Sequence, residues 1–210
     1  PHVRSVFCRQ KVMIRNPRAR GERGATLVES ALITPILLLF IFGIFEFGFA
    51  FRDYLTVANA TREGVREATV AGNLADTDYR TLRSIQRAAA ALSTNGLDLV
   101  VVFKATSPTD AVPASCAAGT SVPNVCNVYM ASDFNVVETD WGCQSTSNTP
   151  PDPIDSPDLN WCPKDRQVST GSGLDYVGIY VKATHEYVTG LFGDTIVFED
   201  QMILKVEPHD

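Results

Sequence analysis

One long apolar segment near the start of the sequence constrains this protein more than any other feature. Between residues 31 and 51 only Thr34 and Glu46 are strongly polar. A helix rises about 1.5 Å per residue and the hydrocarbon core of a bilayer is about 30 Å thick, so residues 25–45 span roughly 31 Å as a helix. No other run in the sequence reaches that length. We therefore expect a single transmembrane helix over residues 25–51.

The charge on either side of this segment predicts its orientation. Residues 1–24 form a basic leader with seven basic side chains and one acid, whereas the residues after position 24 sum to −12 in a chain of net charge −6. Short basic flanks stay in the cytoplasm. We expect a single-pass protein of the cytoplasmic (inner) membrane, with the leader inside and an acidic C-terminal domain that is periplasmic or extracellular. The apolar run is too long for a typical secretory signal peptide.

Two acids in the apolar segment need an explanation, because a carboxylate inside a bilayer is costly. Glu29 has two interpretations. It lies near the cytoplasmic interface and reaches polar headgroups, or it has an assembly role. If the chain is cut between Gly24 and Ala25, the new α-amine of Ala25 in a neighbouring subunit could pair with Glu29. We expect Glu46 near the outer interface, where water solvates it at little cost.

Pro35 lies inside the same segment. Proline removes one backbone donor and clashes with the preceding turn, so we expect a helix kink over residues 31–35. The hydroxyls of Ser30 and Thr34 could bond the backbone groups that the kink frees.

These residues resemble a known family. Gly24-Ala-Thr-Leu-Val-Glu29 resembles the cleavage motif of type IV prepilins. The longer run from Arg23 through Phe45-Glu-Phe-Gly48, with the following Val57-Ala-Asn-Ala-Thr-Arg-Glu-Gly-Val-Arg-Glu-Ala68, resembles the TadE-like family of tight-adherence pilus systems. The run Met202-Ile-Leu-Lys-Val-Glu-Pro208 is similar to the C-terminal strand of that family.

The resemblance implies a structural role: a pseudopilin or minor pilin of a type IV-like pilus that mediates surface adhesion. A prepilin peptidase would cleave between Gly24 and Ala25, and Glu29 would position the subunit in the assembly. The implied partners are the membrane, other pilins and the pilus assembly machinery. The alternative is a statically anchored exported binding domain that is never processed.

The exported part begins with a helical arm over residues 52–96. Small and apolar residues at three- and four-residue spacing predict that the first helix continues to about residue 72, packed either on its own domain or on neighbouring subunits. Asp78 is predicted to cap a second helix from about residue 79 to 94, which ends at Asn95-Gly96. Leu82, Ile85, Ala89 and Leu92 give this helix one apolar face.

A β-rich domain follows over residues 97–210. Runs rich in β-branched residues, partly alternating, predict strands over 97–104, 175–188 and 195–206, and more weakly over 125–130. Together with the helices they indicate an α+β, pilin-like fold with a mostly antiparallel sheet. We expect the apolar corner Leu191-Phe192 to be core rather than a contact surface.

A loop insertion over residues 106–173 contains Cys116, Cys126, Cys143 and Cys162. An even number of cysteines in an exported segment indicates disulfides, with three possible pairings. We favour the sequential pairing, in which each loop adds roughly 3 kcal/mol in the chain-entropy model. The spacings lack a zinc pattern, and we interpret the acidic run 152–158 as solvated rather than as a calcium site.

The remaining features point away from catalysis and nucleic-acid binding. The three histidines are scattered, and we expect His185, in a predicted strand, to be structural. Nucleophile-elbow, zinc-protease and phosphate-loop motifs are lacking, so we predict no enzyme activity, no cofactor and no small-molecule substrate. The acidic exported part argues against nucleic acid as a partner. We expect Cys8 to be reduced in the cytoplasm, and Trp141 and Trp161 to cover the disulfides rather than to form an adhesive surface.

Overall fold

The computed structural model describes residues 18–92, 96–143, 156–171 and 173–208, with side chains from residue 24 onward. It divides into two compact units, Pro1–Ile44 and Phe45–Asp210, which we call the N-terminal and C-terminal units. The predicted Cys8 thiol and most of the acidic run 152–158 lie outside the described residues. One helix, α1 (Arg18–Ala71), contributes to both units.

The described part of the N-terminal unit is the first half of α1. Within the described residues, α1 is the one helix long and apolar enough to cross a membrane. Pro35 lies inside the helix without ending it. The Thr34 hydroxyl donates a hydrogen bond of 2.6 Å to the Ser30 carbonyl one turn earlier, which is the back-bonding expected of threonine near a proline. The kink itself stays a prediction.

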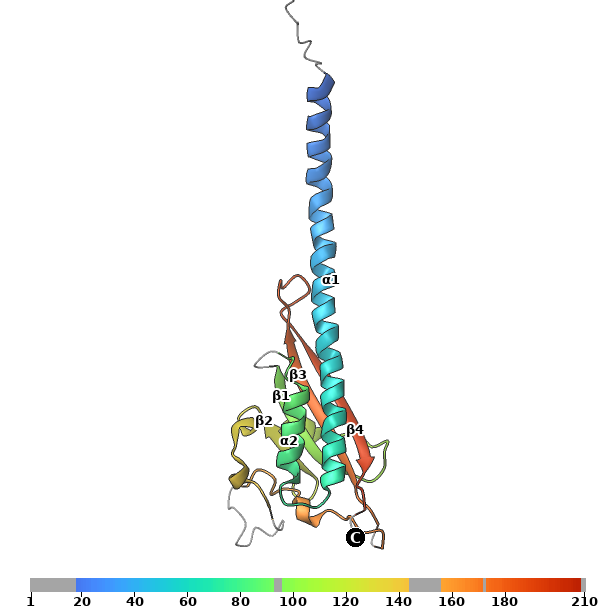
Figure 1. Ribbon diagram of the computed structural model, residues 1–210, viewed down its shortest axis with the longest axis vertical. Helices are drawn as coiled ribbons and strands as arrows, with labels where there is room; N and C mark the ends of the chain where they lie inside the picture. Colours follow the sequence, from blue (N-terminus) through green and yellow to red (C-terminus); the bar gives the residue numbers. More distant parts are fainter. Residues whose placement is uncertain (1–17, 93–95, 144–155, 172, 209–210) are drawn as a thin grey trace, which may run out of the picture. The chain divides into compact units, whose positions relative to one another are not determined.

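The C-terminal unit contains a four-stranded antiparallel sheet in the order β2-β1-β3-β4 (Figure 1). The strands are β1 (Leu97–Ala105), β2 (Cys126–Met130), β3 (Tyr176–Glu186) and β4 (Thr195–Lys205). Each lies within two residues of a strand that the sequence predicts. With the long apolar helix and the shorter helices, the sheet confirms the α+β class.

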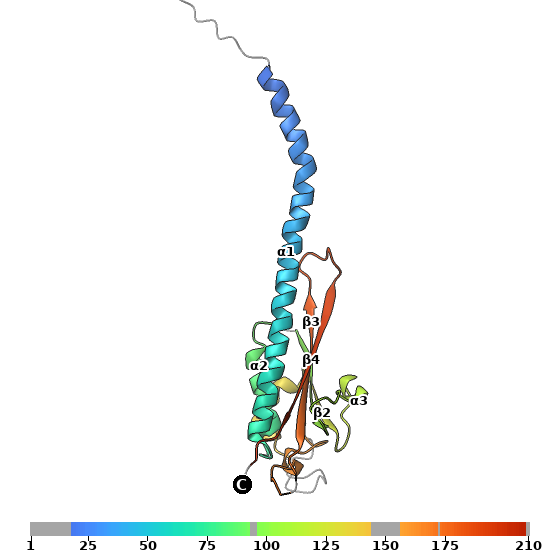
Figure 2. The ribbon, with the colours of Figure 1, turned by 90° about the vertical axis from the view of Figure 1, so that its right-hand side faces the viewer.

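Helices α1 and α2 (Thr77–Ala88) cover one face of the sheet (Figure 2). The core between them includes Val57 and Val65 of α1, Ile85 of α2, and Val100 and Ile179 of the sheet, all at most 1% exposed. The helices approach closely, because a Cβ at Gly64 of α1 would lie 2.5 Å from Cγ1 of Ile85. The arm therefore packs on its own domain along its buried stripe.

Helix α2 differs from its prediction at both ends. Its N-cap is Asp76, and Asp78 lies inside the first turn, where it is fully buried and bonded to other elements rather than to the helix end. The cap prediction is therefore wrong. The helix ends at Ala88, earlier than predicted, and Leu92 still packs against the core as a partly buried side chain. The predicted stop at residue 95 falls outside the described residues.

The other face of the sheet is covered by residues 112–125 of the cysteine-bearing segment, which include the short helix α3 (Ala114–Ala117) (Figure 2). Because both faces are covered, β1 is a continuous apolar run in which residues 99–103 are all buried. Cys116 is bonded to Cys126, and Cys143 to Cys162, which is the sequential pairing. The described residues of the segment also include three single-turn helices: η1 (Asp133–Asn135), η2 (Glu138–Asp140) and η3 (Pro163–Asp165).

Candidate assembly interface

The predicted processing and assembly residues lie on the first described turns of α1. Gly24, Ala25 and Glu29 are all helical and exposed. A Cβ added at Gly24 would meet nothing within 4 Å. Glu29 has no hydrogen bond or ion pair to the described residues, which leaves its carboxylate open to an external partner. Its assembly role stays a prediction.

From residue 27 to residue 45, helix α1 exposes apolar side chains on every side. The large apolar residues of this stretch are all more than a third exposed: Leu27, Val28, Leu32, Ile33, Ile36, Leu37, Leu38, Leu39, Phe40, Ile41, Phe42, Ile44 and Phe45. A helix that is hydrophobic all round is covered by lipid or by other helices. This surface is a candidate interface within the described part of the chain.

Glu46 follows directly after this stretch, and our expectation of a solvated carboxylate is wrong. The residue is 1% exposed. One carboxylate oxygen accepts a 3.0 Å hydrogen bond from the backbone N–H of Val188, and the other accepts one from the N–H of Thr189. The carboxylate therefore ties α1 to the connection between β3 and β4, and two backbone donors take the place of water.

A second polar link joins α1 to β3 one to two turns later. Asp53 is 5% exposed and His185 is 6% exposed, and their Oδ2 and Nδ1 atoms lie 2.7 Å apart. Arg52 binds the other oxygen of Asp53 through Nε and Nη2 at 2.9 and 2.7 Å. His185 thus lies in a strand contact, as its structural interpretation predicts, and its partner Asp53 was not foreseen.

Residues 187–193, which with Asp194 form the connection between β3 and β4, are the part of the C-terminal unit that departs most from prediction. We call them the hairpin tip. Leu191 is 54% exposed and Phe192 is 44% exposed, so the expectation that this corner is core is wrong. The Phe192 ring lies 5.0 Å from the ring of Phe47, between centroids. The tip therefore presents apolar side chains beside the turn of α1 that Glu46 anchors.

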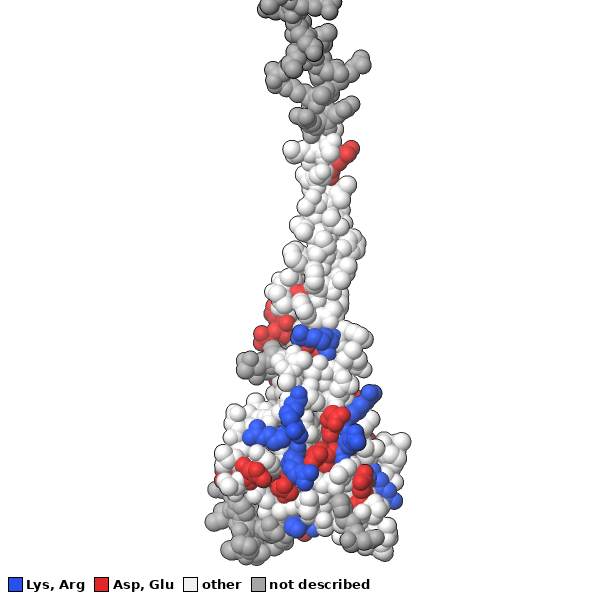
Figure 3. All heavy atoms as spheres, in the orientation of Figure 1, with Lys and Arg blue, Asp and Glu red and all other residues white. Residues whose placement is uncertain are grey.

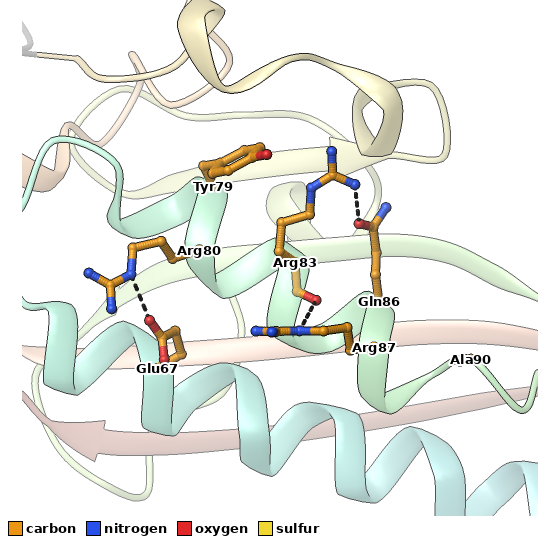
Figure 4. A pocket seen from close by; sticks show the side chains of 7 residues that line it. All are labelled: Glu67, Tyr79, Arg80, Arg83, Gln86, Arg87 and Ala90. Carbon is orange, nitrogen blue, oxygen red and sulfur yellow. Dashed lines mark hydrogen bonds and ion pairs between the residues drawn. The ribbon is translucent and has the colours of Figure 1, made fainter.

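A basic groove lies on the outer side of α1 and α2. Its volume is about 780 Å³, and it is lined by Glu67, Tyr79, Arg80, Arg83, Gln86, Arg87 and Ala90. Figure 3 shows basic side chains, with acidic ones among them, gathered on this face of the molecule. Arg80 is paired with Glu67 at 2.8 Å, Arg83 bonds Gln86, and Arg87 bonds the Arg83 carbonyl (Figure 4). Guanidinium groups in a groove fit carboxylate or phosphate ligands.

A buried charge pair fixes the end of the C-terminal unit that carries the second disulfide. Asp78 and Arg166 have fully buried side chains joined at 2.5 Å. The other carboxylate oxygen of Asp78 accepts hydrogen bonds from the Tyr129 hydroxyl at 2.6 Å and the Asn127 amide at 2.8 Å. The Arg166 guanidinium stacks over the Trp161 ring at 4.4 Å. This network joins α2, β2 and the segment around Cys162.

Both tryptophans lie in the core of this end rather than on a surface. Trp141 is 5% exposed and Trp161 is 2% exposed. Trp141 contacts the rings of Tyr79 and Tyr129 at 5.8 and 5.1 Å. Neither side chain is therefore available as an adhesive contact in this structure.

The acids near Trp161 do not form a metal centre within the described residues, where no group of three or more candidate ligands occurs. Asp158 is instead a buried carboxyl that accepts a hydrogen bond from Ser156. Burial, followed by the nearby charge of Asp78, raises the pKa of Asp158 to about 6. Asp158 is therefore a pH-sensitive part of the core.

Together these features define a class of protein: a chain with one candidate membrane-spanning helix, whose exposed apolar half leads into a disulfide-bonded α+β unit. The comparisons agree with that description. Residues 24–66 match the family model described as TadE-like protein, and this segment is TadE-like as its motifs predicted. Neither the curated proteins nor the solved structures include a match to the chain. The matched segment begins at the predicted cleavage junction and covers the apolar stretch of α1 and residues 52–66 of the helical arm.

Two features of the C-terminal unit, the Glu46 hydrogen bonds and the basic groove, were not predicted from the sequence. The bond from Glu46 to the hairpin tip joins residues more than 140 positions apart, and no local pattern signals it. The basic groove did have a signal, because Arg80, Arg83 and Arg87 recur at three- and four-residue spacing on α2, which places them on one helix face.

Proposed function

We propose that this protein is a pseudopilin or minor pilin of a tight-adherence pilus. The observation that carries the proposal is the exposed apolar half of α1, which matches the TadE-like family from residue 24 onward. Such a surface is stable in lipid before assembly and against other apolar helices after it. One helix then serves as membrane anchor and as packing element.

In this proposal, the basic leader stays in the cytoplasm and a prepilin peptidase cuts between Gly24 and Ala25. The cut gives Ala25 a free α-amine at the start of the apolar helix. Glu29 of one subunit pairs with this amine of a neighbour, which removes two isolated charges from a low-dielectric environment. The exposure of Gly24, Ala25 and Glu29 supports this arrangement.

The first test is intact-mass spectrometry of the membrane-extracted protein, made with and without the peptidase. A chain that starts at Ala25 only when the peptidase is present supports the proposal. A chain that keeps its leader in both cases contradicts it.

Glu29→Gln tests the pairing separately. We expect cleavage to continue, because the cut site is unchanged, while incorporation into fibres falls at least about tenfold, since an uncompensated amine remains in a low-dielectric site. Glu63→Gln is the matched control, because this exposed acid lies on the same helix outside the apolar stretch. Normal fibres with Glu29→Gln would rule out the pairing.

The basic groove favours a second candidate, a statically anchored domain that binds an acidic partner. Its arginines stand out in a chain of net charge −6. This candidate requires an unprocessed leader. It also requires that Arg83→Glu abolish retention of an acidic peptide by the purified protein, whereas the exposed Arg62→Glu on α1 leaves retention unchanged.

A further inference from the structure

The hairpin tip has an unusual composition for an exposed turn. Its seven residues, Tyr-Val-Thr-Gly-Leu-Phe-Gly, include no charge. Val188 is 77% exposed, and Leu191 and Phe192 are also exposed. Gly190 and Gly193 adopt positive φ angles of 67° and 115°, which let the chain reverse over a few residues and project these side chains. Apolar groups exposed together at one place usually mark a contact surface.

Contacts with α1 fix the position of the hairpin tip along that helix. Glu46 accepts hydrogen bonds from two of its backbone N–H groups, and Phe47 contacts the ring of Phe192. A helix over residues 25–45 is roughly 31 Å long, which is about the thickness of the hydrocarbon core. Glu46 is the next residue in the sequence, so it lies where such a helix would leave the hydrocarbon. The tip is therefore held beside the turn at which the helix leaves the hydrocarbon.

We propose that the hairpin tip is a membrane-docking element that inserts into the interfacial layer of the bilayer leaflet on the exported side. The occupant of this surface is lipid. The proposal rests on α1 crossing the membrane and does not depend on cleavage or on fibre assembly.

The chemistry of the tip fits that layer. Phe and Leu are typical of segments whose apolar side inserts at the boundary between hydrocarbon and headgroups, and the tip exposes Leu191 and Phe192. Because the tip has no charged side chain, its insertion desolvates no charge. Two of its backbone donors already bond to Glu46, which lowers the cost of leaving water. The same bonds satisfy a carboxylate that would otherwise face the membrane boundary alone.

Charged residues border the tip and limit how far it inserts. Glu186 at the end of β3 and Asp194 before β4 are both exposed, and the Arg52 side chain on α1 is 52% exposed. A neighbouring apolar groove of about 580 Å³, lined by Phe47, Ala50, Phe51, Tyr54, Tyr187, Ile196 and Phe198, continues the apolar surface along α1 and β4. The docking surface is therefore the tip with the mouth of this groove.

The test uses the full chain in nanodiscs that hold one copy each, with lipids brominated on their acyl chains. Phe192→Trp places a fluorophore at the tip, and the native tryptophans are buried in the core. Val137→Trp is the control, because Val137 is 57% exposed and follows β2, the edge strand that β1 separates from the hairpin of β3 and β4. We expect bromolipid to quench the tip fluorophore about twofold and the control hardly at all.

Other outcomes overturn the proposal. A red-shifted, unquenched Trp at position 192 would place the tip in water. A blue-shifted but unquenched Trp would mean that protein covers it, as in contact with a second copy. Glu46→Ala should lower the quenching, and Glu46→Gln, which keeps a carbonyl acceptor, should retain more of it. Equal quenching in these two variants and in the parent would show that Glu46 does not position the tip.

Discussion

Arg166→Met is the substitution that most directly tests how the C-terminal unit is held together. The Arg166 and Asp78 side chains are both fully buried and bonded at 2.5 Å. Methionine keeps most of the volume but leaves the Asp78 carboxylate without its positive partner. Breaking a buried ion pair from one side costs about 3–5 kcal/mol. We expect the lower end, about 3 kcal/mol, because Tyr129 and Asn127 still donate hydrogen bonds to Asp78.

The double variant separates charge from packing. Asp78→Asn in the Arg166→Met background removes the stranded charge, so the double variant should be more stable than Arg166→Met alone. The surface variant Arg62→Met is the control and should stay within about 0.5 kcal/mol of the parent.

Urea unfolding of the full chain in detergent micelles, followed by tryptophan fluorescence, provides the measurement. Both tryptophans lie in the core of the C-terminal unit, so the signal reports this unit and not the apolar half of α1. A cost below about 1 kcal/mol for Arg166→Met, or a double variant as unstable as the sum of the singles, would refute a charge-coupled pair.

Two further predictions use the same unfolding assay. Gly64→Leu should destabilise the C-terminal unit by about 1–3 kcal/mol, because a side chain there collides with Ile85. Gly48→Leu is the matched control, because an added Cβ there meets nothing within 4 Å. Equal stability of the two variants would contradict the close approach of α1 and α2. The pKa of Asp158 is raised to about 6 from an ordinary 3.8, so the folded protein binds more protons between these values. The contribution of this carboxyl to stability is therefore greatest at low pH, falls as the pH rises from about 4 to 6, and levels off above pH 6. Stability should rise by about 1 kcal/mol from pH 7 to pH 5. Asp158→Asn should flatten that rise, and an unchanged pH profile in this variant would assign the titration to another group.

The features that were predicted correctly from the sequence are those that local residue patterns determine. The β-branched runs that became β1 and β3 carry their strand preference in their own side chains, and β4 followed from the same rule. The apolar half of α1 was predictable because its length alone matches a bilayer. The buried stripe of the arm was also partly visible, since Thr61, Val65 and Ala68 are buried as their spacing predicts.

The errors arose where a distant segment decides the environment of a residue. Asp78 was predicted as a cap from its position before an apolar run, but an arginine 88 positions away makes it part of the core. Leu191 and Phe192 were predicted as core because they are apolar. Their exposure depends on what lies beside a turn, and a one-dimensional pattern does not contain that information.

The two acids of the apolar segment show how far the chain alone determines its partners. Glu46 and Glu29 lie 17 residues apart on one helix, roughly 26 Å along its axis. Glu46 is bonded to backbone donors of its own chain, so it needs nothing from another molecule. Glu29 is exposed and has no such donor among the described residues. In a low-dielectric environment an unpaired carboxylate is costly. Of these two acids, Glu29 is therefore the one without a donor among the described residues, and in our proposal the α-amine of a processed neighbour is its partner.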